Sequence, residues 1–212
     1  MSKRLLLTLL IISLAFVGIF MSLKQKDSTG QNGEKNNTAR QAMEHKLGAG
    51  NKGVTLIEYG DFACPACYQY YPLVEEIKSK YKDDITFQFR HYPLVEIHKN
   101  ALVAAKAAEA AGLQGKFWEM YAKLYENQPS WRESNTPLNF FEDYAAQLGL
   151  NIDKFREDSK SQAVNDTVLA DREAAKKLGL SGTPSFLVNG KKVESPRDVD
   201  GFNKLIEEAS KK

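Results

Sequence analysis

Apolar positions form one unbroken run near the start of the chain. Residues 5–23 carry no charge and are mostly aliphatic, and as a helix rising 1.5 Å per residue they would cross about 29 Å of hydrocarbon. Lys3 and Arg4 precede the run with no acidic residue before them, which favours a cytoplasmic N-terminus. We therefore expect a cytoplasmic tail over residues 1–4 and a transmembrane signal anchor over residues 5–23.

A cleaved signal peptide is the alternative for this segment. Ser13, Leu14 and Ala15 form a small-x-small triplet of the kind that signal peptidases cut. Cleavage there would leave the apolar residues 16–20 exposed at the new terminus, so the uncleaved anchor is favoured. The rest of the chain is then expected on the extracytoplasmic side of a cell membrane, held there by a single pass.

A polar segment follows the apolar run. Residues 24–52 contain no aromatic and no β-branched aliphatic residue and are dense in Asn, Gln, Gly and Lys. This composition is typical of a flexible tether, which over this length reaches roughly 30 Å. A short helix around residues 38–47 is the alternative for part of it.

The next segments alternate between strand and helix patterns. Residues 54–59 form a short apolar, β-rich run ended by Gly60, and residues 85–89 alternate as a second strand does. Between them, apolar positions recur at helical intervals from Pro65 to Tyr81. Strand, helix and strand in this order predict a βαβ unit with a parallel pair of strands.

Helical patterns then dominate up to residue 178. We predict an all-helical insertion over about residues 97–178, because only Ala-rich and amphipathic stretches occur there. Residues 185–188, the Asn189-Gly190 turn and residues 191–193 have the pattern of a β-hairpin. A final amphipathic helix covers residues 199–209, and the fold class is α/β.

Composition narrows the function classes. The chain has 212 residues, 42% hydrophobic residues and a net charge of +2, which excludes a disordered or polytopic membrane protein and gives no reason to expect nucleic acid as a partner. It contains only two cysteines. A disulfide-rich scaffold and a four-cysteine zinc site within one chain are therefore excluded.

Those two cysteines carry the clearest chemical signal. Cys64 and Cys67 are separated by Pro65 and Ala66 at the point where a predicted strand gives way to a predicted helix, which is the context of a redox-active C-x-x-C pair. Amide groups of the first helical turn would stabilise a thiolate on an exposed Cys64. Cys67, one turn further on, would face inward and resolve the mixed disulfide.

Two structural alternatives exist for the cysteine pair. A disulfide between residues three apart closes so short a loop that its entropic stabilisation is small. A zinc site would need two further ligands, and the only histidines, His45, His91 and His98, show no spacing that pairs them. We therefore expect neither a metal ion nor a cofactor, and we expect structural roles for His91 and His98.

Taken together, several motifs resemble the DsbA family of thiol-disulfide oxidoreductases in the thioredoxin superfamily. The similarity covers residues 53–211, most of the chain beyond the anchor and tether. The motifs that carry it are Glu58 with Asp61-Phe62-Ala63-Cys64-Pro65-Ala66-Cys67, Phe89-Arg90-His91-Tyr92-Pro93-Leu94, Ala104-Ala105, Gly115-Lys116-Phe117-Trp118 and Gly182-Thr183-Pro184-Ser185-Phe186.

The resemblance implies a thioredoxin fold interrupted by a helical domain. It also implies a cis peptide bond between Thr183 and Pro184 beside the cysteines, where an extended substrate would bind, and a buried Glu58 that assists proton transfer to the inner cysteine. From the residues alone, a trans Pro184 at a strand start is more common. Likewise, Glu58 could be a solvated charge at a strand end.

Four aromatic residues of the insertion have two possible roles. They recur at helical spacing and are expected in the core rather than in a substrate groove. They are Phe117, Trp118, Tyr121 and Tyr125.

The expected activity is the introduction of disulfides into exported proteins by exchange through Cys64 and Cys67. Such a monomeric, membrane-anchored oxidase implies reduced or unfolded exported proteins as substrates and a quinone-linked membrane protein that reoxidises the pair. The dipeptide between the two cysteines, Pro65-Ala66, has alanine at the position where strongly oxidising relatives carry a histidine. We therefore expect an enzyme that is less oxidising than those relatives. A reductase, an isomerase, a supplier of electrons to one dedicated client such as cytochrome maturation, and a non-catalytic chaperone or adaptor remain as alternatives.

Overall fold

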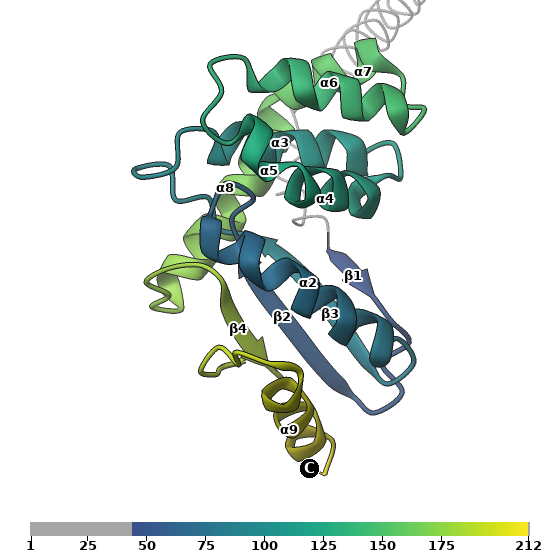
Figure 1. Ribbon diagram of the computed structural model, residues 1–212, viewed down its shortest axis with the longest axis vertical. Helices are drawn as coiled ribbons and strands as arrows, with labels where there is room; N and C mark the ends of the chain where they lie inside the picture. The colour runs from purple at the N-terminus through teal and green to yellow at the C-terminus, as the bar shows by residue number, and fades with distance from the viewer. Residues whose placement is uncertain (1–43, 212) are drawn as a thin grey trace, which may run out of the picture. The chain divides into compact units, whose positions relative to one another are not determined.

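A five-stranded sheet in the order β1-β3-β2-β4-β5 organises the part of the chain that the computed structural model describes, residues 44–211 (Figure 1). The elements in chain order are β1 (His45–Leu47), β2 (Val54–Gly60), α2 (Pro65–Lys80), β3 (Ile85–His91), α3 (Ala101–Gly112), α4 (Phe117–Glu126), α5 (Gln128–Trp131), α6 (Pro137–Gln147), α7 (Ile152–Lys160), α8 (Gln162–Lys177), β4 (Ser185–Val188), β5 (Lys191–Lys192) and α9 (Val199–Ser210).

The predicted βαβ unit is confirmed. Strands β2 and β3 run parallel, with Val54 opposite Ile85 and Gly60 opposite His91, and α2 connects them. Gly60 is required at the end of β2 because a Cβ atom there would lie 2.4 Å from the Phe89 ring. This close packing holds the start of the cysteine loop against the sheet.

The predicted hairpin is also present. Strand β4 runs antiparallel to β2 and to β5, and Asn189 and Gly190 adopt φ angles of 49° and 76° between β4 and β5. Two consecutive positive φ angles are what a tight hairpin turn needs, which explains the Asn-Gly pair. Helix α9 packs on this side through Phe202, whose ring lies 5.1 Å from that of Phe186.

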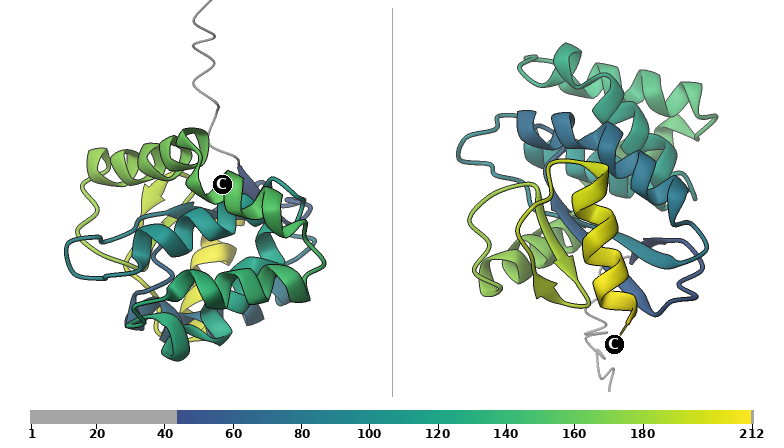
Figure 2. Two further views of the ribbon diagram at one scale, coloured as in Figure 1. Left: turned by 90° about the horizontal axis from the view of Figure 1, so that it is seen from above. Right: turned by 60° about the horizontal axis from the view of Figure 1, so that its bottom comes forward.

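The all-helical insertion is confirmed between β3 and β4. Helices α3 to α7 gather at one end of the sheet, and α8 runs back from them toward β4 (Figures 1 and 2). Helix α3 is rich in buried alanines, which let neighbouring helices approach closely, and Trp131 is fully buried with its indole N–H donating to the Leu124 carbonyl at 2.9 Å. The insertion therefore has an apolar core of its own that continues into the core beneath the sheet.

The tether prediction is wrong at its C-terminal end. Residues His45–Leu47, within the predicted tether, form β1 and pair antiparallel with residues 87–89 of β3, so the helix considered around residues 38–47 does not include these three residues. The pairing uses backbone groups, and a three-residue strand leaves no periodic pattern to detect. Gly48 then turns the chain with a φ of 92°, where a Cβ would lie 2.2 Å from the Ile85 carbonyl oxygen.

The predictions for the N-terminus fall outside the structure. The cytoplasmic tail, the signal anchor over residues 5–23 and most of the predicted tether lie in residues 1–43, which are not among the described residues. Among helices α2 to α9, none combines the length and the hydropathy needed to cross a membrane.

Candidate active site

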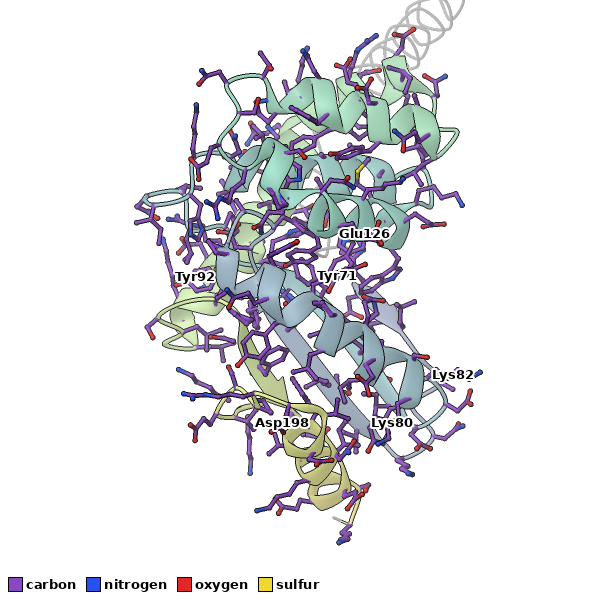
Figure 3. All side chains as sticks on the ribbon, viewed as in Figure 1. Tyr71, Lys80, Lys82, Tyr92, Glu126 and Asp198 are labelled. Atoms are coloured by element: carbon purple, nitrogen blue, oxygen red, sulfur yellow. The ribbon has the colours of Figure 1, made fainter. Side chains whose placement is uncertain are left out.

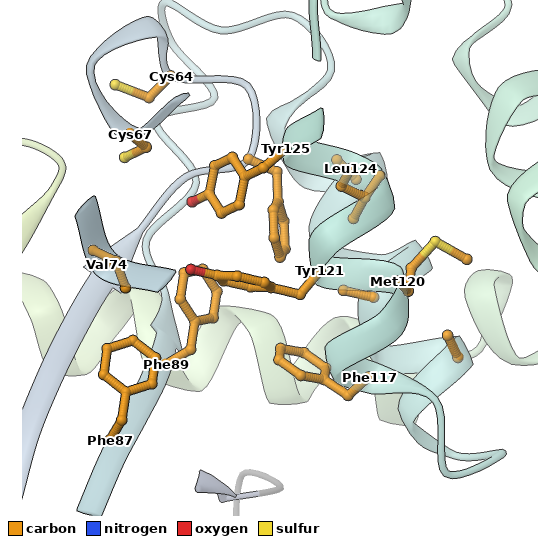
Figure 4. Packing of buried hydrophobic residues seen from close by; sticks show 14 of the residues in the cluster. Cys64, Cys67, Val74, Phe87, Phe89, Phe117, Met120, Tyr121, Leu124 and Tyr125 are labelled. Carbon is orange, nitrogen blue, oxygen red and sulfur yellow. The ribbon is translucent and has the colours of Figure 1, made fainter. Parts of the chain in front are cut away.

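The cysteine pair lies where the sequence predicts, at the N-terminus of α2. Cys64 is the residue before the first helical turn, with extended backbone angles (φ −74°, ψ 124°), and Pro65 begins the helix. Both cysteines are free thiols, and Figure 4 shows them above the aromatic core of the insertion. The free amide groups of the first turn therefore surround the Cys64 sulfur.

Cys64 is more enclosed than expected. Cys67 is completely buried, as predicted, but Cys64 is only 6% exposed rather than open to solvent. The loop before β4 lies against it, with the Thr183 carbonyl oxygen 3.5 Å from Sγ of Cys64. A reacting group must therefore approach Cys64 beside this loop.

The Thr183–Pro184 peptide bond is cis. The resemblance implies this geometry, whereas the residues alone favour a trans bond, and that second expectation is wrong. The structure thus brings Thr183 and Pro184 together with Cys64, although Thr183 lies 119 residues after Cys64 in the chain, beyond the whole helical insertion.

The two thiols have opposite acidities. A hydrogen bond from the Cys67 thiol lowers the pKa of Cys64 to about 5, burial opposes this, and the Thr183 side chain and the amides of Cys67 and Ala66 lower it further. Burial raises the pKa of Cys67 well above its usual range, and so do the charges of Cys64 and Glu58. Cys64 is therefore a thiolate at neutral pH beside a protonated Cys67.

Glu58 is buried, so the alternative of a solvated strand-end charge is wrong. It lies in the middle of the sheet, opposite Phe89 on β3 and Phe186 on β4, and is 1% exposed. Burial raises its pKa to about 8, although the charge of Lys78 opposes the rise. The Tyr121 hydroxyl donates to Oε2 of Glu58 at 3.5 Å, which also lowers the pKa, but burial dominates, so Glu58 can hold a proton at neutral pH.

Asp61 is a structural centre of the loop that sequence analysis did not identify. Its Oδ1 accepts from the Ala63 amide at 2.8 Å, and its Oδ2 lies 3.0 Å from the Leu94 amide and 2.7 Å from Nδ1 of His98. Its own amide donates to the Cys67 sulfur at 3.5 Å. The hydrogen bond to Asp61 raises the pKa of His98. The available signal was the position of Asp61 three residues before Cys64, within the motif that carries the family resemblance.

Gln128 is a second residue that sequence analysis missed. Its buried side-chain amide donates to the carbonyl oxygens of Phe62 at 2.7 Å and of Cys64 at 2.9 Å. Because Gln128 belongs to α5, the insertion holds the cysteine loop directly. No sequence pattern marks a glutamine so far along the chain as a partner of this loop.

The four predicted core aromatics line the inner side of the site. Phe117, Tyr121 and Tyr125 are buried and Trp118 is partly buried, which confirms the core prediction. Figure 4 shows the hydroxyl end of Tyr125 pointing toward Cys67, with the Tyr121 ring next to it. Apolar rings thus exclude water from the inner sulfur, which is why its thiol form is favoured.

A cavity of about 470 Å³ lies on the outer side of α2, where it faces the start of α9. It is lined by Gln69, Tyr70, Leu73, Arg197, Asp198 and Val199. Figure 3 shows Asp198 at this end of α9. Tyr70 connects the cavity to the cis-proline loop, because its hydroxyl donates to the Ser195 carbonyl at 3.4 Å and the Ser195 hydroxyl donates to the Pro184 carbonyl at 3.3 Å.

The family follows from a comparison with known families. The family model described as thioredoxin matches residues 40–208, most of the chain. The chain belongs to the thioredoxin family. Among solved structures, BdbD from Bacillus subtilis in its oxidised form has 25% sequence identity and a TM-score of 0.70, covering 80% of this chain and 94% of that one. The α-DsbA1 protein of Wolbachia pipientis has 23% identity and a TM-score of 0.70, covering 80% and 92%.

The curated proteins with similar sequences have the name of a different protein class, the Na(+)/H(+) antiporters. The chain is 36% identical over 166 residues to Na(+)/H(+) antiporter NhaA 1 of Mycolicibacterium gilvum, which covers 77% of this chain and 26% of that protein. It is 37% identical to Na(+)/H(+) antiporter NhaA 1 of Salinispora arenicola, covering 78% and 24%. The chain therefore spans about a quarter of the length of these relatives, and the similarity concerns that part alone.

The first prediction concerns Glu58. Its pKa of about 8 lies above the ordinary 4.5, so the folded state binds the proton more tightly and wild-type stability should fall as pH rises between these values. Glu58→Gln removes this dependence. The variant should therefore gain stability over wild type progressively from pH 5 to pH 8 in urea unfolding, and its disulfide should be reduced by a dithiol at least about tenfold more slowly.

Glu126→Gln is the matched control, because Glu126 is an exposed carboxylate that accepts a hydrogen bond from Tyr71 (Figure 3). Glu126→Gln should change neither the pH dependence of stability nor the rate at which a dithiol reduces the disulfide. A stability difference between Glu58→Gln and wild type that stays constant across this pH range would contradict the buried, protonated Glu58.

Proposed function

We propose that the protein is a thiol-disulfide oxidoreductase that oxidises dithiols in exported proteins. The observation that carries this proposal is the pairing of two opposite acidities at the start of one helix, a lowered pKa at Cys64 and a raised pKa at Cys67. A structural disulfide has no need of this asymmetry, whereas exchange chemistry uses it in both half-reactions.

The exchange begins from the oxidised pair. A substrate thiolate attacks the Cys64 sulfur, the Cys64–Cys67 bond breaks, and the electron pair leaves on Cys67. Glu58, with its pKa of about 8, supplies the proton that the buried Cys67 thiolate requires. A second substrate thiolate then attacks the substrate sulfur of the mixed disulfide and releases Cys64 as a stabilised thiolate. The substrate loses two electrons and the cysteine pair gains them.

Thr183 and Pro184 are proposed to position the substrate. Proline has no N–H group, so the backbone beside it has no internal donor at this point. An extended substrate segment can pair with the neighbouring backbone groups in the manner of an added strand, with its cysteine beside Cys64. The cavity next to Tyr70 then offers space for flanking apolar side chains.

The acidity of Cys64 supports the oxidising direction of electron flow. At pH 7, a thiol of pKa about 5 favours the reduced form roughly a hundredfold over one of pKa 9.0, which corresponds to about 60 mV. This supports an oxidase of moderate strength, in line with Ala66 in the dipeptide. The proposal includes a quinone-linked membrane protein as the reoxidising partner, a monomeric state, an extracytoplasmic site and anchoring by residues 5–23.

The redox potential tests the direction. We expect a value near −200 mV, between thioredoxin at about −270 mV and DsbA at about −120 mV. The measurement is equilibration of the full chain with glutathione buffers, followed by quantification of the two thiols. A potential at or below that of thioredoxin would favour a reductase and contradict the oxidase direction.

Trapping of mixed disulfides tests the activity itself. Cys67→Ala removes the resolving thiol, so with oxidised glutathione as the oxidant its Cys64 should first form a mixed disulfide with glutathione and then accumulate mixed disulfides with substrate proteins, whereas Cys64→Ala should trap none. Many trapped proteins support a general oxidase, and a single one supports a dedicated client. If Cys64→Ala supports the maturation of exported proteins as well as wild type does, the protein is a chaperone or adaptor and the exchange mechanism is refuted.

A further inference from the structure

Three ionisable residues from separate elements meet where the insertion joins the sheet. His45 lies on β1, His91 on β3 and Glu109 on α3, and all three are buried. None takes part in the exchange reaction proposed above. Each offers one ligand atom, and these atoms lie within 4.8 Å of one another.

The contacts converge on one oxygen atom. Oε1 of Glu109 lies 2.6 Å from Nε2 of His45 and 2.8 Å from Nε2 of His91. Its second carboxylate oxygen, Oε2, is buried and has no hydrogen-bond partner among the described residues, and the same holds for Nδ1 of His91. A hydrogen-bonded triad alone thus leaves a buried acceptor on the carboxylate unsatisfied, which is costly.

The charge in this cluster also lacks a permanent counter-ion. No lysine or arginine of the described residues pairs with Glu109, and the two imidazoles are its only partners. A buried anion of this kind is stabilised by a cation placed among the same atoms.

Aromatic rings fix the orientation of both imidazoles. The His45 ring is stacked on Phe117 with centroids 3.3 Å apart, and the His91 ring stands edge-on to Phe89 at 5.4 Å and to Phe117 at 5.9 Å. Both histidines therefore present Nε2 toward Glu109 from fixed directions. This pre-organisation is what a metal site needs from its surroundings.

We propose that His45, His91 and Glu109 form a binding site for one divalent transition-metal ion, with Zn²⁺ as its natural occupant. Two imidazole nitrogens and one oxygen of the Glu109 carboxylate supply three protein donor atoms, a water molecule would complete the tetrahedral set, and this nitrogen and oxygen set suits Zn²⁺ rather than Ca²⁺ or Mg²⁺. Bonds of about 2.0–2.2 Å to a tetrahedral ion would separate these donor atoms by about 3.3 Å. The His91 nitrogen, 2.8 Å from Oε1, then has to move by about 0.5 Å, and the His45 nitrogen, 2.6 Å from Oε1, by about 0.7 Å.

The site would be structural. It would join β1, the first described strand, to β3 and to the insertion, and so fix the edge of the sheet. Strand β1 has only three residues and pairs with β3 alone, so local opening of this edge gives the ion access. The sequence analysis found no spacing that pairs these histidines, because the ligands come together only through the fold.

Metal titration of the full, untagged chain tests this inference. The cysteines are kept as a disulfide so that their sulfurs cannot bind the ion, which also keeps the test independent of the exchange activity. We expect Co²⁺ to produce the visible spectrum of a tetrahedral site that saturates at one equivalent and is displaced by Zn²⁺. The melting temperature should rise by roughly 5–10 °C at Zn²⁺ concentrations a hundredfold above Kd.

Metal binding by three variants shows whether the ion binds at this cluster or elsewhere in the protein. His45→Gln and Glu109→Gln should each weaken binding by at least about a hundredfold, whereas the matched control His98→Gln, outside the cluster, should bind as wild type does. Unchanged binding in His45→Gln would overturn the proposal. Should either variant fail to fold, the wild type decides alone: no saturation by Co²⁺, no rise in melting temperature with Zn²⁺, or a preference for Ca²⁺ over Zn²⁺ would each refute it.

Discussion

The difference in electrostatic environment between two sulfurs three residues apart is the constraint on which the site depends. Cys64 lies among the free amides of the first turn of α2, and Cys67 lies one turn further in, on the apolar core. The Cys67 thiol stabilises a charge on the first sulfur, Thr183 and the amides of the first turn add to this, and burial opposes a charge on the second sulfur. A helix that begins at the end of a buried strand places the two sulfurs in these different environments.

The rest of the fold keeps that geometry in place from several sides. Asp61 binds the loop before the cysteines to the segment at Leu94 and His98. Gln128 binds the same loop to the insertion, and the cis-proline loop lies against the Cys64 sulfur. The insertion therefore does more than enlarge the domain, because it supplies both a hydrogen-bonding anchor for the loop and the rings that keep water from Cys67 and Glu58.

Local patterns were sufficient to predict the elements and the reacting atoms. The period of the apolar residues identified β2, α2 and β3, the Asn-Gly pair identified the hairpin, and the spacing of Cys64 and Cys67 identified the redox pair. Each of these signals lies within a few consecutive residues. For Pro184 the residues alone favoured the wrong isomer, and only the resemblance to a known family implied the cis bond.

Features that depend on distant partners could not be predicted in this way. Strand β1 escaped notice because backbone pairing of three residues leaves no hydrophobic pattern. Gln128, the Asp61–His98 contact and the His45–His91–Glu109 cluster each combine residues from separate elements, so only the tertiary structure brings them together. The enclosure of Cys64 has the same origin, because the covering loop follows the whole insertion in the chain.

The central claim is that the fold makes Cys64 an acidic thiol. Titration of the reduced protein, followed by the ultraviolet absorbance of the thiolate with Cys67→Ala as a check on assignment, measures this directly. The account predicts ionisation of one thiol with a pKa of about 5, while the second stays protonated above pH 9. Ionisation of Cys64 near its ordinary value of 9.0 would contradict it.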